Sequence, residues 1–266
     1  MASRRALRFT ALGYLALLLA APVGMVFYRA FEHGIGPVVD ALTTPGAEHA
    51  LWLTLEVVLI AVPLNTAFGI GCALLLARRR FPGRALLDRL IDLSFAISPV
   101  VVGLALILVY GQDGWLGGTL ADAGIQVIFS TPGIVLATIF VSLPFVVREV
   151  LPVLREIGDE QEQAAQTLGA SPWQAFWRVT LPAIRPAVVY GVVLSTARAL
   201  GEFGAVSVVS GRLEGRTETL TLYVQNRFEG FDMTGAYAAG VLLALLGIGV
   251  LVALTFVSRR RSEHGY

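Results

Sequence analysis

The sequence predicts an all-α integral membrane protein that crosses the bilayer with six helices. Hydrophobic residues make up 56% of its 266 residues, charged residues make up 15%, and the mean hydropathy is +0.72. Soluble domains carry about a quarter charged residues, so a chain this poor in charge is not expected to be covered by water alone. Six apolar stretches approach the roughly 20 residues that a helix needs to span the hydrocarbon core. They cover residues 7–28, 51–77, 93–110, 128–147, 187–209 and 236–257.

Each stretch is expected to be a helix, because its apolar run is continuous whereas a strand of a membrane barrel alternates in polarity. The first stretch follows Arg4, Arg5 and Arg8 without a convincing cleavage site, so it is interpreted as a retained span. A cleaved signal peptide is the alternative. Prolines and glycines inside the other spans, such as Pro99 in the third, suit kinks and close helix packing.

Neither a repeat nor a low-complexity linker divides the sequence, which predicts a single transmembrane domain over residues 1–266. Arginine alone indicates the orientation, because the sequence has no lysine and cytoplasmic loops carry the excess of positive charge. With both termini in the cytoplasm, 15 of the 20 arginines face that side. A multi-pass membrane protein, surrounded by lipid, is therefore expected.

Other classes of protein fit the composition poorly. A single cysteine, Cys72, excludes a disulfide scaffold, and a net charge of +1 without a long basic cluster disfavours nucleic-acid binding. The histidines His33, His49 and His264 lack the spacing of metal ligands. Neither a metal site nor a bound cofactor is therefore expected.

Residues 148–186 form a long cytoplasmic loop that is expected to contain two short helices. Acidic residues stand at 159, 160 and 162, in what becomes a first helical turn favoured by the helix dipole, and Gly169 is expected to end this helix as a C-terminal cap. Its apolar face consists of Ala164, Ala165 and Leu168.

The second short helix is predicted to begin at Ser171, because Ser171 and Gln174 have the spacing of a capping box around a first-turn proline. Leu181 and Pro182 are expected to end it. Three aromatic residues share one of its faces: Trp173, Phe176 and Trp177. This face either rests among lipid headgroups or inserts into a groove on a cytoplasmic partner.

Residues 163–170, QAAQTLGA, followed by Phe176, Val179, Leu181 and Pro182, resemble the EAA loop of permease subunits of binding-protein-dependent ABC importers. The resemblance implies a protein of the bacterial inner membrane with a type I permease fold, in which this loop couples the spans to an ATPase. Gln163 stands where the family usually has a glutamate, with Glu162 beside it. Whether this part of the loop forms a salt bridge is therefore left open. The coupling residues that the resemblance implies are Gln163, Ala164, Ala165, Gly169, Trp173, Phe176, Trp177, Leu181 and Pro182.

Two further segments narrow the resemblance. Residues 198–211, RALGEFGAVSVVSG, and residues 97–104, ISPVVVGL, are similar to the sulfate and thiosulfate permeases of the CysW type. The resemblance implies three kinds of partner: a second homologous permease subunit, two copies of an ABC ATPase, and a periplasmic sulfate-binding protein. Whether the two permeases are identical is left open.

The chain itself is expected to be non-catalytic, with ATP bound by the partner ATPase. It has no GxxxxGK[ST] phosphate loop and no lysine to complete one. Importing a dianion against an inside-negative potential costs roughly 4.6 kcal/mol per 100 mV, so energy must come from another polypeptide.

Arg198 and Glu202 stand four residues apart in the fifth expected span, where charges are costly and usually functional. The functional interpretation places Arg198, Glu202 and Ser98 along the path of the anion. The alternative is an ion pair that fastens one helix to its neighbours. Asp88 and Asp92, which flank Arg89, are expected to be solvated.

Rival functions also stay open. Molybdate and tungstate are tetrahedral dianions that membrane helices alone do not distinguish from sulfate. A self-contained anion channel or secondary transporter would need its own selectivity ring or ion-coupling site, and neither is evident. An intramembrane enzyme would need a nucleophile with a base, and no histidine lies in the expected spans.

Overall fold

The computed structural model describes residues 2–262, together with the side chains from residue 7 to residue 252 except that of residue 9. The described chain is helical and contains no strand, which confirms the all-α class. The cations expected at the cytoplasmic termini and one histidine lie outside the described side chains: Arg4, Arg5, Arg259, Arg260, Arg261 and His264.

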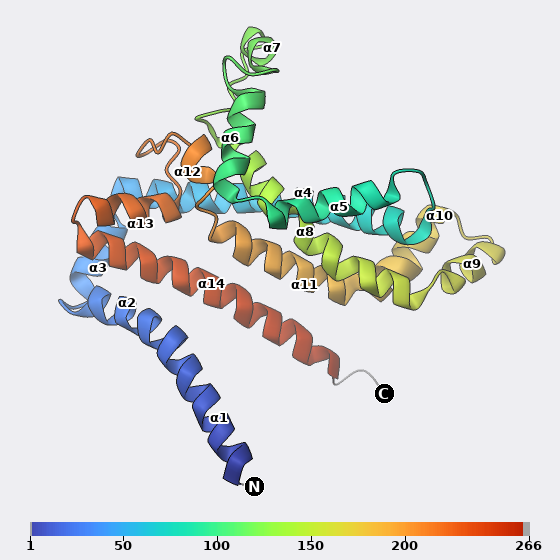
Figure 1. The fold of residues 1–266 in the computed structure, drawn as a ribbon, viewed down its shortest axis with the longest axis horizontal. Helices are drawn as coiled ribbons and strands as arrows, with labels where there is room; N and C mark the ends of the chain where they lie inside the picture. Colours follow the sequence, from blue (N-terminus) through green and yellow to red (C-terminus); the bar gives the residue numbers. More distant parts are fainter. Residues whose placement is uncertain (1, 263–266) are drawn as a thin grey trace.

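Four long helices lie side by side in a bundle (Figure 1). Asn65 fixes two of them within the apolar interior, because its amide donates to Ser142 Oγ at 2.8 Å and to the Ile139 carbonyl at 3.1 Å. Buried polar groups need such partners where water is excluded. The helices are α4 (Pro45–Arg78), α8 (Thr131–Ile157), α11 (Leu181–Leu200) and α14 (Met233–Ser262).

The first apolar stretch stands apart from this bundle. It is a continuous helical run of α1 (Ala2–Leu15), a π-helical turn η1 (Ala16–Ala20) and α2 (Ala21–Phe31). Its apolar part, Thr10–Phe31, is long enough to span a bilayer, yet none of its most apolar window is buried against the rest of the chain. Within this run α2 packs on α14, and the next helix, α3 (Ile35–Leu42), also packs on α14 before the chain enters α4.

The third expected span is broken. Helices α5 (Arg84–Ala96) and α6 (Pro99–Tyr110) meet at an angle of 114°. Ile97 and Ser98 are extended there, and the conformation of Ser98 follows from Pro99, because a residue directly before proline avoids the helical region. Helix α6 is only about 18 Å long and points away from the bundle with α7 (Gly117–Asp122) at its tip (Figure 1). The structure has six candidate spans if this bent pair is counted as one span, and five if it is not counted.

Two spans end at places other than those expected. Helix α8 starts at Thr131 and continues to Ile157, so residues 148–157 belong to it and not to a loop. Helix α11 stops at Leu200, nine residues before the expected end at 209. The chain then turns at Gly201 into α12 (Val206–Val209) and α13 (Leu220–Glu229) before α14 begins.

The cytoplasmic segment forms α9 (Glu160–Thr167), α10 (Pro172–Ala175) and a π-helical turn η2 (Phe176–Thr180). The expected helix end at Leu181 and Pro182 is wrong, because η2 runs directly into α11. In η2 the Leu181 N–H donates to the Phe176 carbonyl, a wider turn that accommodates the donor missing at Pro182. Residues 172–200 are therefore one apolar helical run.

Candidate coupling and translocation sites

The turn between α9 and α10 has the conformation that the sequence predicts. Gly169 adopts a φ of +89°, in the left-handed region, and the Ala170 N–H donates back to the Ala165 carbonyl at 3.0 Å. The capping box is also present: Gln174 N–H donates to Ser171 Oγ at 3.3 Å, and Ser171 N–H donates to Gln174 Oε1 at 2.9 Å. This turn fixes the direction in which α10 starts.

The three aromatic residues after this turn form one cluster. Ring centroids lie 5.4 Å apart for Trp173 and Trp177, 5.4 Å for Phe176 and Trp177, and 6.1 Å for Trp173 and Phe176. The cluster is not covered by this chain, because Trp173 is 68% exposed and Trp177 is 49% exposed. Leu168, on the other side of the turn, is 89% exposed.

The other residues that the sequence predicts to contact an ATPase have mixed environments. Gln163 and Ala164 are exposed on α9, and Ala165 is half-buried. Leu181 and Pro182 lie in the first turn of α11, not at the end of a helix.

Glu162, and not Gln163, makes a salt bridge in this loop, which answers the question that the sequence left open. Its Oε1 lies 2.9 Å from Arg78 Nη2 and accepts a hydrogen bond from Thr180 Oγ1 at 2.8 Å. Sequence reasoning missed this pair because Arg78 is 84 residues away and counted only as a cytoplasmic charge.

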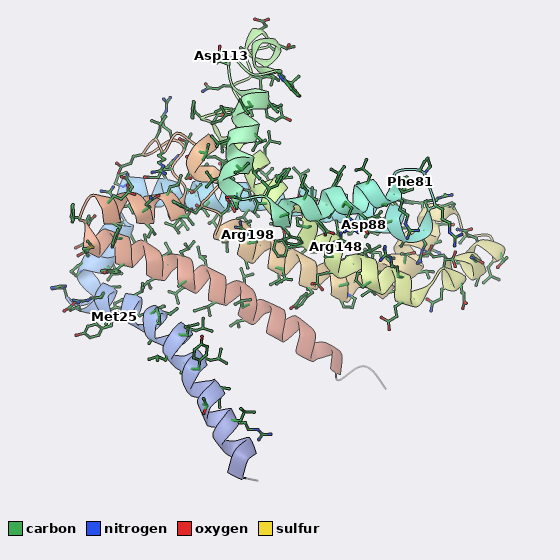
Figure 2. All side chains as sticks on the ribbon, viewed as in Figure 1. Met25, Phe81, Asp88, Asp113, Arg148 and Arg198 are labelled. Atoms are coloured by element: carbon green, nitrogen blue, oxygen red, sulfur yellow. The ribbon has the colours of Figure 1, made fainter. Side chains whose placement is uncertain are left out.

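Asp88 and Asp92 are not simply solvated, contrary to expectation. Arg148 on α8 lies between them, with Nη1 at 2.8 Å from Asp88 Oδ1 and Nη2 at 2.6 Å from Asp92 Oδ1. Figure 2 shows Arg148 and Asp88 where α5 lies against α8. One guanidinium therefore fastens the first half of the broken span to the bundle.

Arg198 and Glu202 form an ion pair across the end of α11. Arg198 lies in the last helical turn, while Glu202 lies beyond Leu200 and not inside a span as expected. Arg198 Nη1 is 2.5 Å from Glu202 Oε2, and Glu202 Oε1 accepts from the Ala205 N–H at 2.8 Å. The Glu202 side chain is 2% exposed and that of Arg198 is 31% exposed, so one partner is fixed and the other retains accessible donors.

Ser98 lies at the bend between α5 and α6, exposed and without a side-chain capping bond. The bend packs near the Glu202 segment, since a Cβ placed on Gly204 would come within 2.8 Å of Pro99 Cβ. The structure thus brings the bend that carries Ser98 to the chain segment that carries Glu202. Among the described residues, no group of three histidine, cysteine or acidic side chains is arranged to hold a metal ion.

Comparison with known proteins agrees with this architecture. Residues 65–263 match the family described as binding-protein-dependent transport system inner membrane component. The chain is 52% identical to the sulfate transport system permease protein CysW of Synechocystis sp. over 96% of its length and 92% of that protein. It is 51% identical to CysW of Escherichia coli K12 over 88% of this chain and 80% of that protein.

A second permease protein of the same Escherichia coli strain is also similar. The sulfate transport system permease protein CysT is 42% identical over 88% of this chain and 85% of that protein. Among solved structures, a bacterial alginate ABC transporter in complex with an alginate-bound periplasmic protein superposes with a TM-score of 0.79 at 20% identity, covering 98% of this chain and 96% of that chain. The chain therefore belongs to the inner membrane permease family of binding-protein-dependent transport systems, and it is a multi-pass membrane subunit of the ABC type.

Proposed function

We propose that this chain is the membrane-spanning permease subunit of an ATP-driven importer of sulfate and thiosulfate. The observation that carries the proposal is the identity of 49–52% to proteins named sulfate transport system permease CysW, over 88–96% of this chain. The remaining features supply a mechanism by which such a subunit works.

The partners are a second homologous permease, two copies of an ABC ATPase and a periplasmic sulfate-binding protein. Similarity to both CysW and CysT of one organism supports a pair of related but different permeases. The ATPase is a separate polypeptide in this proposal, because the chain has no phosphate loop and no lysine.

The helical run of residues 172–200 provides a route for coupling. Its 29 residues extend about 43 Å, from the aromatic cluster of Trp173, Phe176 and Trp177 to the turn that carries Arg198. A helix transmits displacement along its axis better than a loop, since its backbone hydrogen bonds resist bending. Closure of the ATPases against the aromatic cluster therefore moves the end of α11.

At that end, Arg198 presents guanidinium donors to an anion while Glu202 holds it in place. The nearby carboxylate also weakens the attraction, so that a dianion is released after translocation. Ser98 contributes a hydroxyl donor from the opposing bend. The transmembrane potential opposes entry by roughly 4.6 kcal/mol per 100 mV for a dianion, which is why transport requires ATP.

The test is import of radiolabelled sulfate into proteoliposomes that contain this chain, its second permease and the ATPase, with the binding protein outside. The proposal predicts that sulfate import requires ATP inside the proteoliposomes. It also predicts that unlabelled thiosulfate reduces the import of labelled sulfate by competition. Selective competition by molybdate or tungstate would contradict the substrate assignment. Import by this chain alone, without ATPase, would instead support a self-contained channel or secondary transporter.

A further inference from the structure

Glu162 lies at a junction of four helical segments that the coupling proposal leaves without a role. Arg78 is the last residue of α4, Glu162 is on α9, and Thr180 ends η2. The Arg78 guanidinium donates to the Glu162 carboxylate through Nη2 at 2.9 Å and through Nε at 3.3 Å. Thr180 Oγ1 donates to the same carboxylate at 2.8 Å.

The fourth segment is the end of α8. Arg78 Nη1 donates to the Leu154 carbonyl at 2.8 Å. Leu154 lies in the last turn of α8, where carbonyl groups have no partner within the helix and a cation is favoured by the helix dipole. A single guanidinium therefore caps α8 and holds the first turn of α9.

The junction is sheltered from water. The side chains of Arg78 and Glu162 are only 16% and 20% exposed, and Thr180 is 2% exposed. The neighbouring Glu160 and Gln163 on α9 are exposed, so Glu162 is the acid of this turn that faces the bundle. Sheltered charges are screened less by salt than surface pairs, and a bidentate contact adds a defined direction.

The backbone on either side of α9 does not by itself fix this helix against α4 and α8. Gly158 precedes it with a φ of +63°, Gly169 follows it with a φ of +89°, and neither has a neighbouring atom within 4 Å of an added Cβ. Gly158 can reach other backbone conformations at little cost, and the hydrogen bonds of the Gly169 turn fix α9 relative to α10 but not relative to α4 and α8. Side-chain contacts must therefore set the position of α9.

We infer that Arg78 and Glu162 are positioning residues that fix the coupling loop to the second and fourth spans. Displacement of the loop then moves α4 and α8 together with α11, and not α11 alone. This inference rests on the proposed coupling role of the loop. It assigns to Glu162 an internal contact, so that the ATPase meets the exposed aromatic cluster and not this carboxylate.

The test compares Glu162→Gln, Arg78→Met and the double variant in the full complex, reconstituted with ATPase and binding protein. Glu160→Gln and Arg79→Met are matched controls, since both residues are exposed neighbours. Three quantities are measured: ATPase that co-purifies, ATP hydrolysed, and sulfate imported per ATP. Each single variant is expected to retain ATPase and hydrolysis but to import roughly fivefold less sulfate per ATP. The double variant is expected to be no worse than either single one, because the two residues act as one unit.

Two results would overturn the inference. Unchanged import per ATP in Glu162→Gln would mean that the junction plays no part in coupling. Loss of the ATPase from Glu162→Gln, with membrane insertion intact, would make this carboxylate a docking residue.

A second readout does not depend on sulfate being the substrate. Spin labels at positions 79 and 166, in a Cys72→Ala chain within the complex, report the distance between α4 and α9. The inference predicts a narrow distance distribution that ATP leaves unchanged, and a broad one when Glu162→Gln is added. Equal widths with and without Glu162→Gln would contradict the junction even if another anion is the substrate.

Discussion

Arg198 lies within one turn of the C-terminus of α11, where a cation is favoured by the helix dipole. Its partner Glu202 is buried and held by the Ala205 N–H, so the carboxylate is part of the turn. Arg198 is partly exposed and is the member of the pair that an anion can reach. We therefore expect the arginine to contact the anion and the glutamate to position the arginine.

Arg198→Ala is expected to reduce sulfate uptake roughly tenfold or more, because hydrogen bonds to charged groups contribute about 1.5–3 kcal/mol. Labelled sulfate uptake and co-purification of the second permease are measured together, with Arg216→Ala, an exposed arginine, as control. Adding Glu202→Ala is expected to restore stability, since no unpaired carboxylate stays buried, but not uptake. Normal uptake by that double variant would remove Arg198 from the mechanism.

Glu218 is another buried acid, in the segment between α12 and α13. Its side chain is 1% exposed and accepts a hydrogen bond from Asn226 Nδ2 at 2.9 Å. Burial raises the pKa of Glu218; the Asn226 hydrogen bond lowers it, the Glu214 carboxylate raises it, and Arg227 lowers it, with a net rise. At pH values between the pKa of Glu218 in the unfolded chain, about 4.3, and its raised pKa in the folded protein, the folded protein binds more protons than the unfolded chain. Stability therefore falls as the pH rises through this window.

Glu218→Gln is expected to stabilise the protein at pH 8 and to have no such benefit at pH 4.5, because glutamine stays uncharged and can still accept from Asn226. Each tenfold difference in the proton-dissociation constant corresponds to about 1.4 kcal/mol. Thermal unfolding in detergent at both pH values measures the effect. Glu229→Gln, on the exposed end of α13, is the control. Equal destabilisation of the Glu218→Gln protein at both values would contradict this role of burial.

At the scale of elements, the broken span is held by close packing of α6 on α12. A Cβ placed on Gly103 would come within 2.8 Å of the Ala205 carbonyl oxygen and of Val208 Cβ. Because one of these atoms belongs to the backbone, the neighbour cannot simply rotate away. The position of α6 thus depends on glycine at this point.

Gly103→Ala is expected to lower the stability of the purified permease by about 1–3 kcal/mol, the usual cost of overpacking. Gly71→Ala is the matched control, because Gly71 lies in α4 with no atom within 4 Å of the added Cβ. Thermal unfolding of both variants is compared with the parent chain. Equal unfolding temperatures for the two variants would show that α6 is not packed on α12 in this way.

Local elements of this fold follow from the sequence, because their determinants are local. The capping box at Ser171 and the left-handed Gly169 are set by residues within one or two turns. The ends of α8 and α11 do not follow, since hydropathy indicates which residues prefer lipid and not where a helix stops. The π-helical turn before Pro182 likewise reverses what proline predicts locally.

The candidate sites also contain some features that the local sequence predicts and others that it does not. The aromatic cluster could be predicted from helical spacing, and Arg198 from the cost of charge in lipid. The Arg78–Glu162 and Arg148–Asp88 pairs join residues 84 and 60 apart in sequence. Such pairs depend on how the helices are arranged in the fold, and neither the hydrophobic periodicity nor the spacing of residues in the sequence indicates that arrangement.

At the scale of the whole molecule, the two candidate loop regions lie at opposite ends of the bundle. Figure 1 shows α9 and α10 at one end and α12 and α13 at the other. Arginine bias predicts that the first end is cytoplasmic. On this prediction the aromatic cluster faces the side where ATP is available, and Glu214 and Asp113 face the periplasm.

Cysteine labelling in a Cys72→Ala chain tests this orientation. A cysteine at position 113 is expected to react with a membrane-impermeant maleimide in intact cells, and one at position 171 only after permeabilisation. Both positions are exposed, so accessibility from one side decides the result. Labelling of position 171 in intact cells would mean that the protein is inserted the other way round.

The central claim is that the α9–α10 turn couples a cytoplasmic ATPase to the spans, and Gly169→Val tests it most directly. Gly169 has a φ of +89° with no atom within 4 Å of an added Cβ, so valine disturbs the backbone by strain of about 1–3 kcal/mol and not by collision. Gln166→Val, on exposed α9, is the control, and Trp173→Ala and Phe176→Ala test the aromatic cluster itself.

The measurement is co-purification of the ATPase with tagged permease, scored beside sulfate uptake. The account predicts that Gly169→Val inserts into the membrane and pairs with the second permease normally, but loses both the ATPase and uptake. Trp173→Ala and Phe176→Ala are expected to change both quantities in the same direction, and Gln166→Val to change neither. Full ATPase binding with full sulfate uptake in Gly169→Val membranes would contradict the account.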